Sequence, residues 1–392
     1  MEFITNKIGN IADLKAGGDA PKYVSNVRTD EFCYPIFSNG ISNEGLYGYT
    51  NKYTMSANTL TISARGTIGA VFYRKEPYLP IVRLISIIPN ENIILPKYMY
   101  YLLKSFPIEG FGAVQQQLTI PYYKKTKVTF EKDLKTQDKV ASILSTYDDL
   151  IEKNNRKIEI LQEMAEELYK EWFVRFRFPG YKTAKFIDGI PEGWEYKPFS
   201  DVATFERGVS YSSEEIDCED GINLINLKNI NSFGGFRLDG TKKYNGKYRD
   251  TQVVKCGDLV MGVTDMTQDR RTVGAVALIP YYDNVCVISA DLVKLVSKVD
   301  NIFIYCLCRY GYYSKFFSQF ANGSNVLHLK PTSLRNKKVL MPKDELIKAF
   351  VKIVKPMSDS VNGLNRQNEL LKQQRDLLLP RLMSGKLEVK VS

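Results

Sequence analysis

The sequence lacks the features that mark several common protein classes. No apolar run approaches the roughly 18 residues of a membrane-spanning helix, and the start MEFITNKIGN has no signal-peptide pattern. The six cysteines show no Cys-x-x-Cys spacing, so neither a zinc site nor a disulfide framework is indicated. Cys306 and Cys308 lie in the apolar stretch IFIYCLCRYGYY and are predicted to be buried thiols. We expect a cytoplasmic protein without a metal site.

Catalytic motifs are equally scarce. A phosphate-binding loop needs Gly-x4-Gly-Lys-Ser/Thr, and the nearest segment, GTKKYNGKY at 240–248, has the wrong spacing and no serine or threonine after its lysine. No Pro-Pro dipeptide exists, which excludes the Asn/Asp-Pro-Pro-aromatic loop of an adenine methyltransferase. The only histidine, His328, is predicted to face a ligand or to be a satisfied structural residue. We expect no catalytic centre and no cofactor.

Positive charge is what the chain has in excess. The net charge is +10 and the pI is near 9.0, which makes a polyanion the natural partner. The excess lies in residues 1–135 and 346–392, whereas 136–185 and 186–345 each balance to zero. A second half that bound nucleic acid would therefore need a local basic face. At 392 residues the chain is also long enough for two domains.

The chain contains an internal repeat of one structural unit. Three pairs of segments match in the same order: 3–17 with 194–208, 67–71 with 272–276, and 155–161 with 365–371. The spacing between matched residues increases along the chain, so the second copy carries insertions. Each copy begins with short β-type runs punctuated by Gly, Asn and Pro, and ends in a helical segment.

The helical segments carry matching apolar seams. A sustained 4-3 spacing runs over 140–172 in the first copy and over 350–382 in the second. Each seam holds one asparagine, Asn154 and Asn368, which would fix the register by finding a facing partner. We predict that the two helices pair antiparallel with each other. The alternative is two amphipathic helices that each pack on their own domain.

Two prolines limit the second helix. Pro356 and Pro380 would kink or end it, so 357–379 is its expected continuous part. The resulting architecture is α+β, a pseudo-two-fold internal repeat of two mixed α/β domains alternating with two long helices. The expected boundaries are 1–135 for the first domain, 136–176 for the first helix, 177–193 for the connector, 194–345 for the second domain, and 346–392 for the second helix and tail.

This pattern resembles the specificity subunit (HsdS) of type I restriction-modification enzymes over essentially the whole chain. The ending LLKQQRDLLLPRLMSGKLEV is similar to the family's second spacer helix and tail, and MAEELYKEWFVRFRFPG to the end of the first spacer. FSNGISNEGLYGYTNKY with TISARGTIGAV resembles the first half of one target-recognition domain. INLINLKNINSFGGFRL with GDLVMGVT does so for the other.

The resemblance implies a division of labour. This subunit would read an interrupted sequence in double-stranded DNA. Two methyltransferase (HsdM-like) subunits would methylate adenine, and ATP-dependent endonuclease (HsdR-like) subunits would cleave. Two alternatives stay open: a DNA-specificity module of another methyltransferase-based phage-defence system, and an enzyme with a degenerate nuclease or methyltransferase site.

Base reading needs amides and guanidinium groups, whereas phosphate contact needs lysine, arginine and hydroxyls. In the first copy the richest cluster is GAVQQQLTIPYYKK, where glutamines suit adenine and lysines suit phosphate; a Gly turn beside an arginine is a second place of close approach. The candidates there are Ser38, Asn39, Arg65, Thr67, Gln115, Gln116, Gln117, Thr119, Lys124 and Lys125.

The second copy offers NGSNVLHLKP at the equivalent place. The resemblance implies that a Gly-Ser-x-Gln-like loop here closes the recognition domain and approaches DNA, although this copy has Asn325 where Gln is usual. A solvent loop without a ligand is the competing interpretation. The candidates in this copy are Asn226, Lys228, Asn229, Gln268, Arg270, Arg271, Ser324, Asn325, His328 and Lys330.

Overall fold

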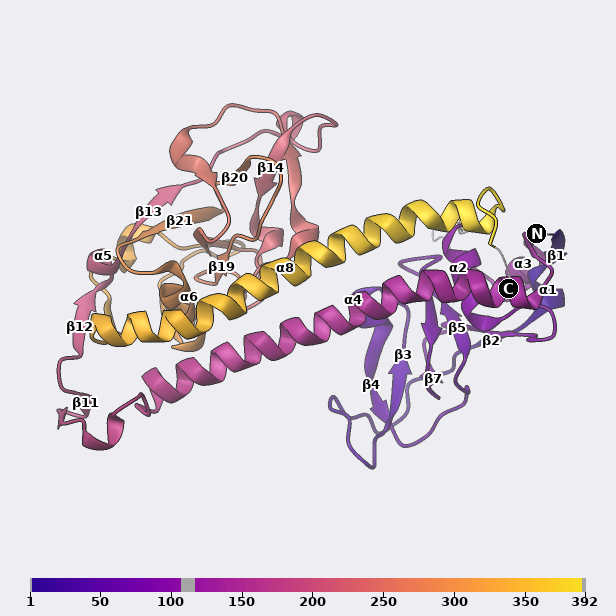
Figure 1. The fold of residues 1–392 in the computed structure, drawn as a ribbon, viewed down its shortest axis with the longest axis horizontal. Coiled ribbons are helices and arrows are strands. Elements are labelled where there is room, and N and C mark those ends of the chain that lie inside the picture. Colours follow the sequence, from indigo (N-terminus) through magenta and orange to yellow (C-terminus); the bar gives the residue numbers. More distant parts are fainter. Residues whose placement is uncertain (1, 107–116, 390–392) are drawn as a thin grey trace. The chain divides into compact units, whose positions relative to one another are not determined.

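The computed structural model describes residues 2–106 and 117–389. The chain divides into two compact units: unit 1 comprises Met1–Lys153 with Asn368–Ser392, and unit 2 comprises Asn154–Gln367. Each unit therefore holds a part of both long helices (Figure 1). No helix in the described ranges is long and apolar enough to cross a bilayer.

Unit 1 is built from nine strands and three short helices before the first long helix, counted over the described residues. Its elements are β1 (Phe3–Lys7), α1 (Ile8–Ile11), β2 (Ala12–Ala16), β3 (Tyr34–Phe37), β4 (Leu46–Thr50), β5 (Thr59–Ile62), β6 (Val71–Arg74), β7 (Leu79–Pro80), β8 (Ile85–Pro89), α2 (Pro96–Lys104), α3 (Ile120–Lys125), β9 (Lys127–Glu131) and α4 (Leu134–Tyr169), which continues into unit 2.

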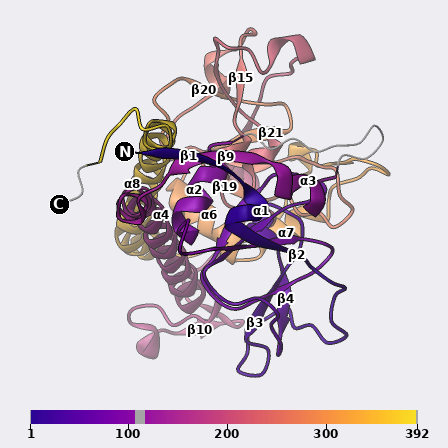
Figure 2. The same ribbon diagram turned by 90° about the vertical axis from the view of Figure 1, so that its right-hand side faces the viewer.

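The core of unit 1 is a four-stranded sheet in the order β2-β8-β5-β6, with antiparallel neighbours. A three-stranded sheet, β4-β3-β7, contains one parallel pair, and β1 pairs with β9. Figure 2 faces this unit and shows β1 and β9 together with α1 and α3. Leu60 of β5 faces Ile87 of β8, and both are fully buried because β5 is a central strand.

Unit 2 repeats this arrangement with additions. Its elements are β10 (Phe186–Ile187), β11 (Ile190–Pro191), β12 (Glu195–Pro198), α5 (Phe199–Val202), β13 (Ala203–Arg207), β14 (Ile222–Ile225), β15 (Lys242–Tyr244), β16 (Val253–Val254), β17 (Leu259–Gly262), β18 (Thr264–Asp265), β19 (Val276–Leu278), β20 (Cys286–Ile288), β21 (Leu292–Ser297), α6 (Asn301–Tyr310), α7 (Tyr313–Ser318), β22 (Leu327–His328), β23 (Lys338–Met341) and α8 (Asp344–Met383), which ends in unit 1.

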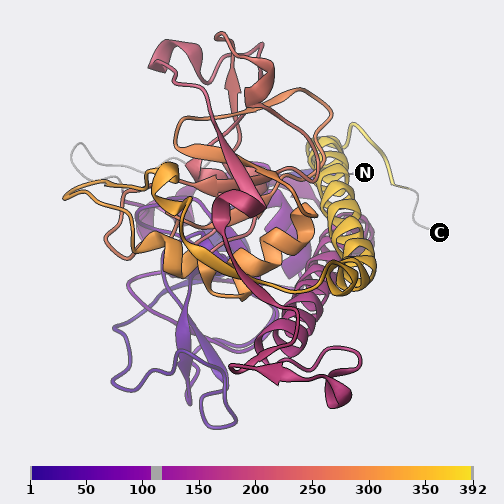
Figure 3. The same ribbon diagram turned by 90° about the vertical axis from the view of Figure 1, so that its left-hand side faces the viewer.

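The two units share one topology. The order β13-β21-β17-β19 reproduces that of the four-stranded sheet of unit 1, and β12 pairs with β23 as β1 does with β9. In the other sheet, β14 has an antiparallel neighbour, β15, and a parallel neighbour, β20, as β3 has β4 and β7. Figure 3 turns unit 2 to the viewer, with α6 and α7 in orange. The predicted α+β internal repeat is confirmed.

The long helices pair in unit 2. Asn154 Nδ2 donates to Gln367 Oε1 at 3.1 Å, whereas Tyr169, later in α4, has its ring centroid 5.8 Å from that of Phe350, earlier in α8. Contacts that advance along α4 while retreating along α8 define an antiparallel pair. The predicted antiparallel pairing is therefore confirmed within this unit.

The far end of α8 belongs to the core of unit 1. Leu379 and Leu382 are buried in the same cluster as Val140 and Leu144 of α4. The alternative, in which each helix packs only on its own domain, is wrong because the second helix contributes to the core formed by the first copy.

The expectation that prolines would interrupt the second helix is also wrong. α8 is continuous over 40 residues and includes both Pro356 and Pro380. The Ser360 and Ser384 hydroxyls donate to the carbonyl oxygens of these prolines at 2.8 and 2.6 Å. Packing of α8 on both cores outweighs the hydrogen bond that each proline removes.

The cysteines of α6 are buried as expected. Cys306 and Cys308 are at most 1% exposed, and burial raises the pKa of the Cys308 thiol to about 12. These thiols are packing residues in the core of unit 2.

Candidate nucleic-acid interface

Each unit carries a glycine turn held by the same backbone hydrogen bonds. In unit 1 this turn spans residues 63–70, which we call turn loop 1. The Ser63 N–H donates to Ala70 O at 2.9 Å, and the Gly69 N–H donates to Ser63 O at 3.0 Å. Gly69 has φ 85°, a conformation that favours glycine. This frame is made only of backbone groups, so exposed side chains on the loop do not build it.

Turn loop 2, over 262–275, has the equivalent frame in unit 2. The Gly262 N–H donates to Ala275 O at 2.9 Å, and the Gly274 N–H donates to Gly262 O at 2.7 Å. Gly274 has φ 78°, close to the value in the first copy. Turn loop 2 is longer than turn loop 1. This extra length accounts for part of the increase in the spacing between matched residues of the two copies.

A second loop lies against each turn loop. The Leu118 N–H donates to Ala64 O at 2.9 Å in unit 1, and the Leu329 N–H donates to Val263 O at 2.8 Å in unit 2. We call these return loops 1 (117–119) and 2 (322–330). The structure thus brings together, in both copies, two segments that are far apart in sequence.

In unit 1 the loops present a guanidinium and an amide. Arg65 is exposed, and its Nη2 donates to Gln117 Oε1 at 3.2 Å. Thr67 holds a buried hydroxyl with no hydrogen-bond partner among the described residues. Gln115 and Gln116 lie outside the described residues.

The side chain of Asn39 holds turn loop 1 through hydrogen bonds to backbone groups. Its Oδ1 accepts from the Ala64 N–H at 2.8 Å, and its Nδ2 donates to Val82 O at 2.7 Å. The neighbouring Ser38 is half-buried, and its N–H donates to Gly45 O at 2.8 Å. Asn39 therefore has its amide committed to the framework.

The predicted phosphate-binding residues of unit 1 lie on α3. Lys124 and Lys125 are exposed in its last turn, and the exposed Thr119 precedes its first residue. This helix follows directly after return loop 1, so both lysines share a segment with Gln117.

In unit 2 the two loops are joined by a different pair. Gln268 Nε2 donates to Ser324 O at 2.7 Å, and both residues are exposed. Arg270 Nη1 donates to Ser318 O at 2.7 Å, and this arginine has a positive φ of 56°. Arg271 is exposed and pairs with Asp269 at 2.6 Å.

Return loop 2 presents the remaining candidates. His328 pairs with Thr264 in the short β18–β22 ladder, and its side chain is exposed. Asn325 and Lys330 are exposed in the same loop. An exposed surface of amide, imidazole and ammonium groups can donate and accept hydrogen bonds with an extended polar ligand.

Two candidates of unit 2 serve the framework. Asn226 is 5% exposed, and its Nδ2 donates to Gly240 O at 2.7 Å. Asn229 is fully buried, and its Nδ2 donates to Arg237 O at 2.8 Å. Lys228 between them is exposed. In this structure neither asparagine has a free amide at the surface.

Sequence reasoning missed Asp265, which organises turn loop 2. Its carboxylate is 2% exposed and accepts from the N–H groups of Thr267 at 2.8 Å, Thr272 at 2.6 Å and Val273 at 3.2 Å. The Thr267 hydroxyl donates as well, at 2.8 Å. Burial opposes ionisation, but these hydrogen bonds outweigh it and lower the pKa of Asp265. The sequence signal that could have identified Asp265 is an aspartate two residues before a threonine in a loop, because aspartate side chains often accept hydrogen bonds from the backbone two residues on.

The described parts of the chain contain no group of three His, Cys, Asp or Glu residues placed to hold a metal ion. What the candidate surfaces combine is hydrogen-bonding capacity and positive charge. Guanidinium and amide groups can form paired hydrogen bonds with base edges, and lysines can contact phosphates.

Comparison with known proteins gives one consistent result. A family model described as the type I restriction modification DNA specificity domain matches residues 2–162. The chain is 26% identical over 348 residues to the type I restriction enzyme MjaIX specificity subunit of Methanocaldococcus jannaschii, which covers 84% of this chain and 78% of that protein. It is 32% identical over 122 residues to the putative type I specificity subunit S.MpnORF289P C-terminus of Mycoplasma pneumoniae, which covers 30% of this chain and 83% of that protein.

A solved structure supports the fold. The crystal structure of the type I restriction-modification system S subunit from M. genitalium aligns with a TM-score of 0.63 at 18% identity, over 99% of this chain and 97% of that chain. The internal repeat, the long helices and these relatives agree, and the chain belongs to the family of type I restriction-modification specificity subunits.

Proposed function

We propose that this chain binds double-stranded DNA and reads a bipartite, interrupted target. Unit 1 would read one half-site with turn loop 1 and return loop 1, and unit 2 the other with turn loop 2 and return loop 2. The observation that carries the proposal is the repeated backbone frame bearing different side chains, Arg65 with Gln117 in one copy and Gln268 with Ser324 in the other.

The chemistry of these side chains favours base reading. Arginine pairs with guanine and glutamine with adenine in the major groove, where each base pair presents a distinct pattern. Around them, Lys124, Lys125 and Lys330 are exposed and suit phosphate contact. The net charge of +10 adds a general attraction to a polyanion.

The reactions themselves belong, in this proposal, to partner subunits acting in the cytoplasm. Two methyltransferase subunits would methylate adenine at the target that this chain selects, and ATP-dependent endonuclease subunits would cleave unmodified DNA. This chain would supply specificity and no catalysis. The names of its relatives, which are specificity subunits, support that division.

The test is a selection for methylated sites from randomised DNA, using the chain reconstituted with its methyltransferase subunits. Arg65→Ala should relax the bases of one half-site and Gln268→Ala those of the other. Each lost paired contact should reduce discrimination by about 1–3 kcal/mol, which is roughly 5- to 150-fold.

The control is Lys182→Ala, an exposed residue of the connector, which should leave both half-sites unchanged. Relaxation of both half-sites by either single variant would contradict the assignment of one reader to each unit. Methyl transfer by the purified chain alone would contradict a purely specifying role.

A further inference from the structure

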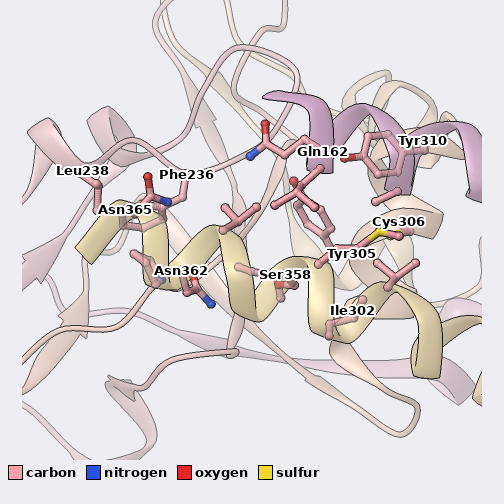
Figure 4. A pocket seen from close by; sticks show the side chains of 17 residues that line it. Gln162, Phe236, Leu238, Ile302, Tyr305, Cys306, Tyr310, Ser358, Asn362 and Asn365 are labelled. Carbon is pink, nitrogen blue, oxygen red and sulfur yellow. The ribbon is translucent and has the colours of Figure 1, made fainter. Parts of the chain in front are cut away.

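Unit 2 contains a cavity of about 190 Å³ between α4, α6 and α8 (Figure 4). Tyr305, Cys306 and Tyr310 of α6 line it together with Ser358 of α8. Phe236 contributes a further aromatic ring. None of the residues around the cavity carries a formal charge.

The internal repeat identifies the equivalent place in unit 1. In α2, Lys104 Nζ lies 5.0 Å from the ring centroid of Tyr100. In α6, Arg309 Cζ lies 5.6 Å from the ring centroid of Tyr305. The same cation–aromatic pair, one turn apart, aligns the two helices and makes Tyr101 the counterpart of Cys306.

The long helices align in the same way. α4 begins at Leu134 and α8 at Asp344, and their seams correspond position by position. Asp148 is therefore the counterpart of Ser358. Later in the two helices, Arg375 is the counterpart of Ala165.

In unit 1 these counterparts form a hydrogen-bonded cluster. The Tyr101 hydroxyl donates to Asp148 Oδ2 at 2.6 Å, and Asp148 forms an ion pair with Arg375. Beside them, Lys75 Nζ pairs with Glu152 at 2.5 Å. A phenol ring, a carboxylate and a guanidinium thus occupy the place between α2, α4 and α8.

Unit 2 has a smaller or uncharged residue at every one of these positions. Cys306 replaces the tyrosine, Ser358 the aspartate and Ala165 the arginine, while Pro280 and Asn362 replace the lysine and glutamate. All five line the cavity. The cavity is therefore the volume that a tyrosine-centred cluster fills in the other copy.

We propose that this cavity binds a small uncharged aromatic molecule of about the size of phenol. A cavity of roughly 150 Å³ is enough to hold benzene, and this one is about 190 Å³. Three aromatic side chains line it, which favours a ring as the occupant. A charged ligand would have no ionic partner on the lining, so its desolvation would go uncompensated.

The polar groups of the lining suit a hydroxyl on that ring. Gln162, Ser358 and Asn365 line the cavity, and their side chains make no hydrogen bond within the described residues. A phenolic hydroxyl can donate to an amide oxygen and accept from a hydroxyl or an amide N–H. Phenol is thus a better probe than benzene for this site.

The experiment titrates the full chain with phenol and follows binding by ligand-observed NMR and by the thermal midpoint. We expect one saturable site with a dissociation constant on the order of 1 mM or below. The midpoint should rise with the logarithm of phenol concentration above that value. Benzoate and benzylamine, which have charged groups on a similar ring, should bind at least ten times more weakly.

Filling the cavity should weaken binding. Ala165→Leu is expected to weaken phenol binding at least tenfold, whereas Glu163→Leu introduces a leucine at an exposed position of α4 and should not weaken it. If Ala165→Leu fails to fold, as judged by circular dichroism, Ser358→Val tests the same volume from α8. No saturable binding by the full chain, or binding unaffected by the filling variant, overturns the proposal.

A reciprocal variant tests the comparison between the units. Tyr101→Cys, Asp148→Ser and Arg375→Ala together transfer three of the five unit 2 residues to unit 1. This chain should bind two phenol molecules instead of one. A stoichiometry that stays at one in the folded variant would show that these three replacements do not account for the cavity.

Discussion

The replacement Asp265→Asn tests whether one buried carboxylate holds turn loop 2 in place. The two carboxylate oxygens accept four hydrogen bonds, from Thr267, Thr272 and Val273. Asparagine has the same shape but only one oxygen, so two donors would face an NH₂ group. Hydrogen bonds to a charged group contribute about 1.5–3 kcal/mol each, and the site is 2% exposed, so a loss of about 3 kcal/mol is expected.

The pH dependence of this loss has a definite sign. Because the pKa of Asp265 is lower in the folded protein, its contribution is fully present above the unfolded value, near 3.8. The contribution disappears as the pH falls below that value and through the folded pKa. The stability difference between the parent chain and Asp265→Asn should therefore be constant at neutral pH and shrink in acid.

Two assays are needed, one for the stability of the protein and one for the DNA sequences that it selects. Urea unfolding of the full chain should report the loss in unit 2, and methylation selection should show relaxed bases in only one half-site. Asp269→Asn is the matched control because Asp269 is exposed and forms a surface ion pair with Arg271. If the two variants had equal stability and equal targets, the carboxylate would not organise the loop and the argument would fail.

Four further outcomes follow from particular contacts. Gln117→Ala should relax one half-site by roughly 5- to 150-fold in the same selection. Lys124→Ala should weaken binding to all sequences, and it should reduce the slope of log K against log salt by about 1 in a filter-binding titration. Arg375→Ala should destabilise unit 1 by about 2 kcal/mol in urea, since it leaves the half-buried Asp148 carboxylate without its ion-pair partner. Arg156→Ala breaks an exposed ion pair and should change stability by less than about 0.5 kcal/mol. Pro356→Ala should stabilise the protein by about 1–2 kcal/mol, because an exposed proline in a helix interior is worse than alanine, and an unchanged midpoint would contradict this.

The sequence was most informative where the two copies had to solve the same packing problem. Ile8 and Phe199 are both fully buried, and the matched pair Ile11 and Val202 is at most 2% exposed. Apolar residues at matched positions predict a shared core because burial depends on residue type and spacing alone. The seams of the long helices were predictable for the same reason.

The sequence was least informative where hydrogen bonding decides the role of a polar residue. Asn226, Asn229 and Asn39 have the amides that base reading requires, yet their amides bind backbone groups of the framework. Residue type alone cannot distinguish these roles, because the amide of a loop asparagine can form hydrogen bonds either with a ligand or with the protein backbone. Pro356 misled in another way: a local preference against helix was overridden by packing along the whole of α8.

The differences between the copies follow from how each place is stabilised. The turn loops are held by backbone hydrogen bonds and by the side chains of Asn39 and Asp265, so exposed side chains such as Arg65 and Gln268 can differ without cost to the frame. The cluster around Asp148 is the opposite case, because removal of Arg375 alone would leave a poorly exposed carboxylate without its ion-pair partner. Charged members of such a cluster are therefore expected to change together. Unit 2 agrees with this expectation, because none of the five counterpart residues that line its cavity is charged. The cavity lies where the charged cluster lies in unit 1.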